Sequence, residues 1–287
     1  MQIVTDRGMD LAPEQMEGLD IHFVPLRITL NGVTYTSGVD IDSQEFYRLL
    51  SETESFPTTS QPSAGEFAQL YRELAKTDPD ILSLHISSGL SGTMNAARAG
   101  AEMVPEANVT LVDTKTLSCP MGWQVWAAAR AVKAGWSKER VIELVKQVWE
   151  GSEGLFTLSN LNYLVHGGRI SHLKGLIASL LNIKPIIGVE RERGIYIPYG
   201  QEVTLKRAIS KLADVVANWY PRGSALSVQL LHGYNPEAVE VLKKRMSETF
   251  ECYFEPLVPV APVLGAHTGP SLVGMAVGLR DVLSKIP

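Results

Sequence analysis

Hydroxyl-bearing and glycine residues gather in two short segments of the 287-residue sequence, each directly before a helical pattern. The first is residues 57–63, Pro-Thr-Thr-Ser-Gln-Pro-Ser, and the second is residues 87–93, Ser-Ser-Gly-Leu-Ser-Gly-Thr. Successive hydroxyls and backbone N–H groups at a helix start form a concavity suited to a phosphate or a carboxylate. Ser, Thr and Pro also cluster before helices because they cap helices and form turns. For residues 57–63, the residues alone leave both interpretations open.

The second segment follows an apolar strand pattern at residues 81–87, and this position favours ligand binding. Loops at the carboxyl ends of parallel strands are where α/β proteins bind ligands, and glycines let the backbone approach a ligand closely. The segment is no phosphate-binding P-loop, because no Gly-x-x-x-x-Gly-Lys-Ser/Thr occurs. It is no nucleophile elbow either, because Gly89-Leu90-Ser91-Gly92 lacks one spacer.

Two glycine-containing segments in the second half carry a cation and an imidazole. Gly167-Gly168-Arg169 can present the guanidinium to a carboxylate or phosphate. The same residues are equally typical of a helix C-cap followed by a surface salt bridge. His267 lies between glycines in a predicted turn at 265–269, where it could orient a hydroxyl, donate to an anion or act as a base.

Composition excludes several classes of protein. The chain has 26 basic and 31 acidic residues, a formal charge of −5, which gives no reason to expect nucleic acid as a partner. Cys119 and Cys252 have no metal-ligand spacing, and we expect reduced thiols and no metal site. The charged N-terminal segment does not resemble a secretory signal. Apolar tracts at 176–182 and 257–266 are shorter than the roughly 20 residues that span a bilayer. We therefore expect a cytoplasmic protein.

Short apolar strands alternate with amphipathic helices, the pattern of an α/β protein with mainly parallel sheets. In the first half we predict strands at 2–5, 22–29, 81–87 and 109–113, and helices from Ser63 onward and at 94–103, 122–134 and 138–149. In the second half we predict strands at 155–159, 185–189, 226–231 and 252–257, and helices at 161–166, 173–181, 205–219 and 236–250. A domain boundary is expected near 150–153, which gives domains 1–153 and 154–287.

Seven segments together resemble the DegV family in their order and spacing. They are Val4-Thr5-Asp6, Thr58-Thr59-Ser60-Gln61-Pro62-Ser63, Leu90-Ser91-Gly92-Thr93, Val112-Asp113-Thr114, Gly167-Gly168-Arg169-Ile170-Ser171, Leu180-Leu181-Asn182-Ile183-Lys184-Pro185 and His267-Thr268-Gly269-Pro270. Each is weak alone, but the joint order is specific and covers about residues 2–284. The resemblance implies two α/β domains with a fatty acid tunnel between them. Some members are the fatty-acid-binding subunits of bacterial fatty acid kinases, in which a separate ATP-dependent kinase phosphorylates the acyl carboxylate.

The resemblance also implies the roles of particular residues. Thr59 and Ser91 would bind the carboxylate, and His267 would order the hydroxyls around it. The set of expected carboxylate-binding residues is Thr59, Ser60, Ser91, Gly92, His267 and Thr268. Arg169 would contact either the head group or the partner protein.

Two departures from the family pattern stand out. The family usually has Asp-Ser-Thr where this chain has Asp6-Arg7-Gly8, which puts a role for that loop in doubt. Gly-Pro-Gly is usual where this chain has Gly269-Pro270-Ser271. Because Ser can cap a helix, we expect little change there.

The implied function is that of a carrier rather than an enzyme. It would bind one long-chain fatty acid, such as palmitate, stearate or oleate, as a monomer with no cofactor and only transient membrane contact. Apolar runs at 173–181 and 258–264 are candidates for the tunnel lining, although such runs are also typical of ordinary core. Two alternatives remain: a serine hydrolase with Ser91 as nucleophile and His267 as base, and an enzyme of phosphorylated metabolites that uses the 87–93 loop as its anion site.

Overall fold

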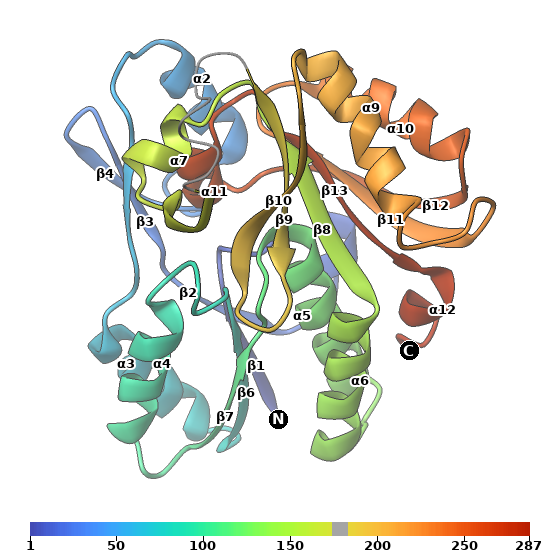
Figure 1. The fold of residues 1–287 in the computed structure, drawn as a ribbon. Coiled ribbons are helices and arrows are strands. Elements are labelled where there is room, and N and C mark those ends of the chain that lie inside the picture. The colour runs from blue at the N-terminus through green and yellow to red at the C-terminus, as the bar shows by residue number, and fades with distance from the viewer. Residues whose placement is uncertain (174–182) are drawn as a thin grey trace.

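The computed structural model describes residues 1–173 and 183–287, and an all-parallel sheet forms its N-terminal part. The strand order is β2 (Ile21–Val24), β1 (Gln2–Asp6), β6 (Asp80–His85) and β7 (Asn108–Asp113). Helices α3 (Ala64–Ala75) and α4 (Thr93–Glu102) pack against each other beside this sheet (Figure 1). The first domain therefore has the parallel α/β architecture that its apolar strands predict.

The second sheet is larger and mostly antiparallel. Its order is β10 (Ile195–Glu202), β9 (Lys184–Glu190), β8 (Ser152–Thr157), β13 (Val273–Leu279), β11 (Ala225–His232) and β12 (Glu251–Pro259), and only β11 and β12 pair in parallel. The prediction of mainly parallel sheets is therefore wrong for this half. A tight turn joins β9 to β10, with Gly194 at φ +65°, and so short a connection can link only antiparallel strands.

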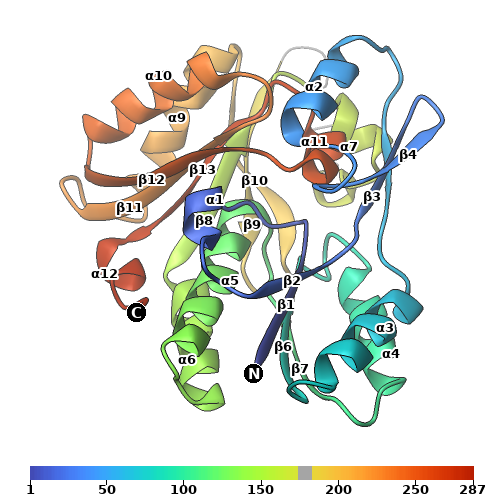
Figure 2. The same ribbon diagram turned by 180° about the vertical axis from the view of Figure 1, so that it is seen from behind.

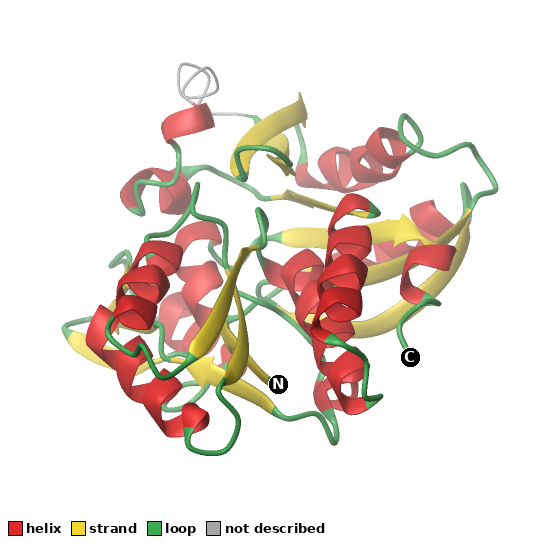
Figure 3. Ribbon diagram, turned by 90° about the horizontal axis from the view of Figure 1, so that it is seen from below, coloured by secondary structure: helices red, strands yellow, loops and turns green. Residues whose placement is uncertain are grey.

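Helices cover both faces of the second sheet. Helices α9 (Leu205–Val216) and α10 (Pro236–Ser247) contact it on one side. Helices α5 (Ser118–Lys133) and α6 (Lys138–Glu150) contact it from the side of the first sheet, as the view from below shows (Figure 3). Helix α5 also contacts β1, so it lies between the two sheets.

A third, three-stranded antiparallel sheet connects the halves near the top of the molecule (Figure 2). It consists of β4 (Val33–Thr36), β3 (Arg27–Leu30) and β5 (Thr58–Ser60), with α2 (Ser43–Ser51) nearby. The predicted single strand at 22–29 is in fact β2 and β3, in different sheets. Pro25 lies between them, has no N–H to donate and so favours a break in the ladder.

Several helix boundaries follow the local signals. Ser63 caps α3 in a capping box with Glu66, as predicted. The turn predicted at 265–269 is wrong, because residues Pro262–Thr268 form helix α11 and only Gly269, at φ +75°, ends it. Gly265 is a packing position: a Cβ there would lie 2.4 Å from the Tyr47 hydroxyl. The remaining short helices are α1 (Pro13–Met16), α7 (Asn162–His166), the 3-10 helix Ser171–Leu173 and α12 (Arg280–Leu283). Apart from its first residue, the helix predicted at 173–181 lies outside the described residues.

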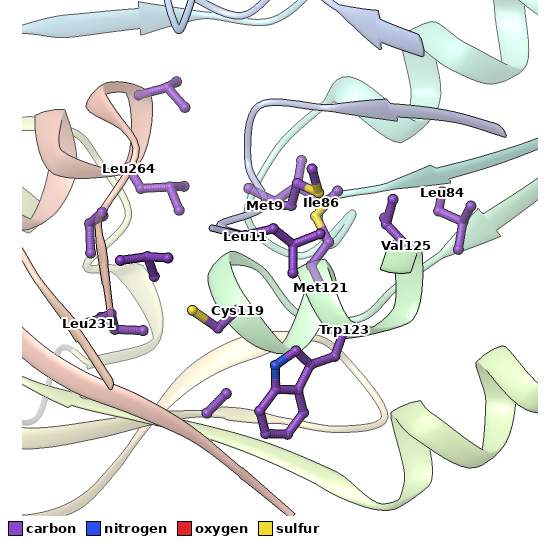
Figure 4. Close-up of a cluster of buried hydrophobic side chains, with 14 of the residues drawn as sticks. Met9, Leu11, Leu84, Ile86, Cys119, Met121, Trp123, Val125, Leu231 and Leu264 are labelled. Atoms are coloured by element: carbon purple, nitrogen blue, oxygen red, sulfur yellow. The ribbon is translucent and has the colours of Figure 1, made fainter. Parts of the chain in front are cut away.

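The largest buried cluster spans both halves of the chain (Figure 4). Trp123 on α5 is fully buried and donates its indole N–H to Gln229 Oε1 on β11, 2.6 Å away. Leu231 and Leu264 belong to the same cluster as Met9 and Ile86. The predicted domain boundary at 153 falls within β8, and it stays a prediction. The two halves therefore share one hydrophobic core.

Candidate functional site

A cavity of about 260 Å3 opens between the two halves, and we call it the outer chamber. It is lined by Leu26, Thr59, Ser60, Gln61, Ile86, Leu90, Ser91, Leu117, Arg169, Tyr196, Val263, Leu264 and His267. Five of the predicted site residues therefore face one space, although they come from segments up to 208 positions apart. The segments at 57–63 and 87–93, which the sequence singles out separately, meet here.

A second, smaller cavity of about 40 Å3 adjoins the first, and we call it the inner chamber. It is lined by Thr116, Leu117, Ser118, Pro120, Gly154, Leu155, Phe156, Val189, Tyr196, Leu231, Val260, Leu264, Thr268, Leu272 and Met275. Leu117, Tyr196 and Leu264 line both chambers. The outer chamber thus has both polar and apolar walls, whereas apolar side chains dominate the inner one. Of the apolar run at 258–264, only the part from Val260 onward lines a chamber.

Thr59 and His267 form the best-defined polar contact of the outer chamber. Thr59 Oγ1, on β5, lies 2.7 Å from His267 Nε2, on α11. Burial, and secondarily the charge of Arg169, lowers the pKa of His267 to about 3, so the imidazole is neutral at pH 7. A neutral imidazole carries one N–H, and if that proton is on Nε2, the Thr59 hydroxyl proton is left to donate into the chamber.

The other side of the His267 ring faces the glycine pair. His267 Nδ1 is buried and has no hydrogen-bond partner among the described residues. A Cβ on Gly167 would lie 2.0 Å from that nitrogen, so only glycine leaves room for the imidazole. Gly167 also ends α7, and Gly168 follows at φ +72°. The helix C-cap interpretation of this motif is therefore correct, but the first glycine has a second role.

Arg169 is held at the chamber wall by backbone carbonyls. Its Nη1 donates to Gly167 O at 2.6 Å and its Nε to Leu90 O at 3.4 Å. Burial lowers its pKa from the usual value, yet a guanidinium stays charged at pH 7. In the described part of the chain no carboxylate pairs with it, so the alternative of a surface salt bridge is wrong for these residues.

Ser91 and Gly92 stand at the start of α4. Ser91 Oγ lies 2.9 Å from Thr93 Oγ1 and accepts a 3.3 Å hydrogen bond from the Thr93 backbone N–H. Gly92 is the N-cap of α4 and packs against Gln61, because a Cβ there would lie 2.0 Å from Gln61 Oε1. The first turn of α4 has no acidic residue. The helix dipole therefore favours an anion at this helix end.

The remaining predicted residues fall at the edges of the site. Ser60 lines the outer chamber and is exposed. Thr268 lines the inner chamber, and its hydroxyl donates to Leu264 O at 3.1 Å. Gly92 lines neither chamber. None of these three residues takes part in the Thr59–His267 contact.

Several residues of the site are absent from the sequence-based expectations. Gln61 belongs to the segment at 57–63, but the family resemblance implies no role for it. Leu117 and Tyr196 line both chambers, and nothing in their spacing marks them as different from ordinary core. Leu264, which also lines both, belongs to the apolar run at 258–264 that is expected to line the tunnel. Tyr196 lies on β10, a strand that the sequence analysis does not predict because Pro198 and Gly200 interrupt its pattern.

The departure at Asp6-Arg7-Gly8 lies outside both chambers. Asp6 is fully buried and accepts from the backbone N–H groups of Gly8 at 2.7 Å and Ile86 at 3.0 Å, and its other contact is His85 Nδ1 at 2.9 Å. The Arg7 guanidinium lies 3.8 Å from the centre of the Phe23 ring. The loop is thus a structural support for β6, whose following residue Ile86 lines the outer chamber.

The geometry does not support the Ser91–His267 hydrolase alternative. In the described residues no hydrogen bond joins the two side chains, and no carboxylate orients His267 from Nδ1. A pKa of about 3 also makes His267 a weak base at pH 7. Among the residues with described positions, no cluster of His, Cys, Asp or Glu could hold a metal ion, and no helix is long and apolar enough to cross a bilayer.

Comparison with known proteins places this geometry in a family. The family model described as "Uncharacterised protein, DegV family" matches residues 1–279. A DegV domain-containing protein of Staphylococcus aureus is 36% identical over 275 residues, 96% of this chain and 97% of that protein.

Two solved structures share the fold over nearly their whole lengths. One is a DegV family protein of Thermus thermophilus described for its fatty acid binding, with a TM-score of 0.87, 29% identity and coverage of 97% of this chain and 99% of that one. The other is the B3 protein of Streptococcus pneumoniae fatty acid kinase, loaded with linoleic acid, with a TM-score of 0.81 and the same coverage; at 20% identity it supports the fold alone. These matches confirm the predicted two-domain α/β fold, and the chain belongs to the DegV family.

Proposed function

We propose that this protein binds one long-chain fatty acid and presents its carboxylate to a separate ATP-dependent fatty acid kinase. The observation that carries the proposal is an outer chamber that holds polar and charged side chains and adjoins a largely apolar inner chamber. The Thermus thermophilus relative in structure is described as fatty-acid-binding, which supports the same ligand class. In this proposal the carboxylate lies in the outer chamber and the acyl chain enters the inner one.

The outer chamber suits an anion. Arg169 supplies a positive charge, the dipole of α4 favours an anion at its start, and none of the described lining residues is Asp or Glu. Neutral His267 leaves the Thr59 hydroxyl free to donate in one tautomer. Hydrogen bonds to a charged group contribute about 1.5–3 kcal/mol each. We therefore assign Thr59, Ser91 and Arg169 to the carboxylate, and His267 to the orientation of Thr59.

The inner chamber suits an acyl chain in chemistry but is narrow. Its volume of about 40 Å3 is only a few times the roughly 10–15 Å3 that a cavity needs to hold one water molecule. A chain of a dozen or more carbons can enter only when lining side chains rearrange. Met275 and Leu272 line the space, and the unbranched thioether of methionine adapts readily. Binding should therefore widen this chamber.

The ligand assignment is tested by what the purified protein carries. Burial of about 15 methylene groups gives on the order of 12 kcal/mol gross, from which ordering costs are subtracted. The protein should therefore retain fatty acid from its expression host. Native mass spectrometry should show an added mass of a C14–C18 fatty acid, and denaturing extraction should release free acid rather than ester.

Delipidated protein provides the complementary test. A ligand that binds only the folded state raises the melting temperature, so palmitate, stearate or oleate should each raise it. Hexadecane of similar chain length but without a carboxylate serves as the control and should raise it less. If complete delipidation is demonstrated, no fatty acid is found in untreated protein and added acid leaves the melting temperature unchanged, the proposal is wrong.

The kinase part of the proposal has its own test. Phosphoryl transfer depends on positioning of the acceptor oxygen, and a fixed carboxylate provides that. Loaded protein, ATP and the fatty acid kinase of the same cell should yield acyl phosphate, detected as hydroxamate after trapping. If the protein binds fatty acid but no acyl phosphate forms, the fatty acid carrier function stands and the proposed kinase partnership is wrong.

A further inference from the structure

Tyr196 occupies the boundary between the two chambers. It lies on β10, its side chain is 3% exposed, and it lines both the outer and the inner chamber together with Leu117 and Leu264. Its ring meets Phe156 edge-on, with centroids 5.5 Å apart and an interplanar angle of 72°. Tyr196 is the one polar side chain of the three that line both chambers. It therefore stands where a bound molecule would change from polar to apolar.

Within residues 1–173 and 183–287 the Tyr196 hydroxyl forms no hydrogen bond to another side chain or to the backbone. Its ring is buried, but the oxygen is not among the fully enclosed polar atoms, so it can be reached from the chambers that Tyr196 lines. Burial raises the pKa of Tyr196, so the hydroxyl keeps its proton at pH 7 and remains a donor. The site thus offers a donor that lacks an acceptor.

The charged group that acts on this hydroxyl is Arg169, which also lines the outer chamber. The two groups interact electrostatically, and the positive charge of the guanidinium favours an anion between them. Because Gly167 O and Leu90 O already accept from Arg169, the guanidinium is fixed in place. A carboxylate placed against Arg169 would have Tyr196 on its inner side and the Thr59–His267 pair among its other neighbours.

We propose that Tyr196 is a positioning residue that donates its hydroxyl to the carboxylate from the inner side, while its ring contacts the first methylenes. This inference rests on the proposed fatty acid binding and adds to it. Tyr196 would fix how deep the acid enters, and it would favour a free acid over a neutral lipid of equal length. Charge-assisted hydrogen bonds are about twice as strong as neutral ones, so the preference depends on the ionised carboxylate.

Tyr199 provides a matched control on the same strand. It lines neither chamber, and its ring lies edge-on to Trp219 with centroids 5.2 Å apart. Tyr196→Phe and Tyr199→Phe therefore remove the same oxygen from neighbouring positions, one inside the site and one outside it. Phenylalanine keeps the ring packing in both, so both variants should fold.

The experiment measures dissociation constants of delipidated wild type and both variants for palmitate and for 1-hexadecanol. Tyr196→Phe should weaken palmitate binding about tenfold or more and change hexadecanol binding by less than about threefold. Tyr199→Phe should change neither. A melting temperature for each protein verifies that all three are folded.

The outcomes separate this inference from the proposed function. Equal palmitate affinity in wild type and Tyr196→Phe overturns the Tyr196 assignment alone. So does an equal loss for palmitate and hexadecanol, because that pattern indicates packing rather than carboxylate recognition. Wild-type protein that binds no palmitate overturns the proposed function, and this inference with it.

Discussion

His267 and Asp10 give the stability of this protein two opposite dependences on pH. His267 is buried beside Arg169, and its pKa falls from 6.5 to about 3. Between these values the unfolded chain binds a proton that the folded chain does not, so folded stability decreases as the pH falls below 6.5. At about 1.36 kcal/mol per pH unit, the full range corresponds to about 5 kcal/mol.

Asp10 acts with the opposite sign. It is buried, and burial raises its pKa from 3.8 to about 6 despite the Ser118 hydroxyl at 2.5 Å and the Ala261 N–H at 2.8 Å. Here the folded chain holds a proton that the unfolded chain releases, so folded stability decreases as the pH rises from about 4 to 6. The corresponding free energy is about 3 kcal/mol.

Single substitutions separate the two contributions. His267→Gln removes the first and Asp10→Asn removes the second, and each keeps a polar group of similar size. Urea unfolding at a series of pH values gives the free energy of unfolding of each variant minus that of the wild type. Between pH 7.5 and 4.5 this difference should rise by about 3 kcal/mol for His267→Gln and fall by about 2 kcal/mol for Asp10→Asn.

The signs of the two difference curves test the reasoning more strictly than their magnitudes do. Other ionisable groups cancel in the differences, because they are common to all three proteins. Two flat difference curves would mean that neither pKa is displaced by burial. Two curves of the same sign would mean that at least one of the environments described above is wrong, and a flat His267→Gln curve would remove the argument that a neutral imidazole orients Thr59.

The remaining predictions concern the residues around the carboxylate. Thr59→Ala with Ser91→Ala should weaken fatty acid binding and reduce acyl phosphate formation by a larger factor, and unchanged phosphorylation would remove both residues from the head-group site. Gly167→Ala should destabilise the protein by about 1–3 kcal/mol through the contact with His267 Nδ1, and less so in a His267→Ala background, as a double-mutant cycle in urea would measure. Gly168→Ala is its control: with nothing within 4 Å of its Cβ, only the φ of +72° opposes it, and fatty acid binding should be unaffected.

The parts of the fold that local signals determine could be predicted from the sequence. The capping box of Ser63 and Glu66 marks the start of α3, and the continuous apolar run before Ser87 marks β6. Each signal involves only residues within one element. Strand β10 could not be predicted. As an edge strand it tolerates Pro198 and a register shift before Gly200, which break the alternation that identifies a strand.

Glycine positions show the limit of local reasoning more sharply. Gly265 and Gly269 indicate a turn when they are considered alone, and Gly269 does have a positive φ. Gly265 instead lies in helix α11, where the absence of a side chain leaves room for the Tyr47 hydroxyl. The tyrosine is 218 positions away in the sequence, so no window around residue 265 contains the reason for the glycine. Likewise, the reason for glycine at position 167 is its contact with His267, which lies far away in the sequence.

The division into two chambers determines what each residue can contribute. The acyl chain, with a gross burial free energy on the order of 12 kcal/mol, would supply most of the affinity, whereas each head-group hydrogen bond adds about 1.5–3 kcal/mol. Removing Thr59 or Ser91 should therefore leave a protein that still binds lipid. What such a variant loses is the fixed position of the carboxylate oxygen, and a partner kinase needs that position because phosphoryl transfer requires alignment with the incoming phosphate. Assays of binding alone would then underestimate the importance of these residues, and the measurement that reveals their role is the ratio of phosphorylation to binding.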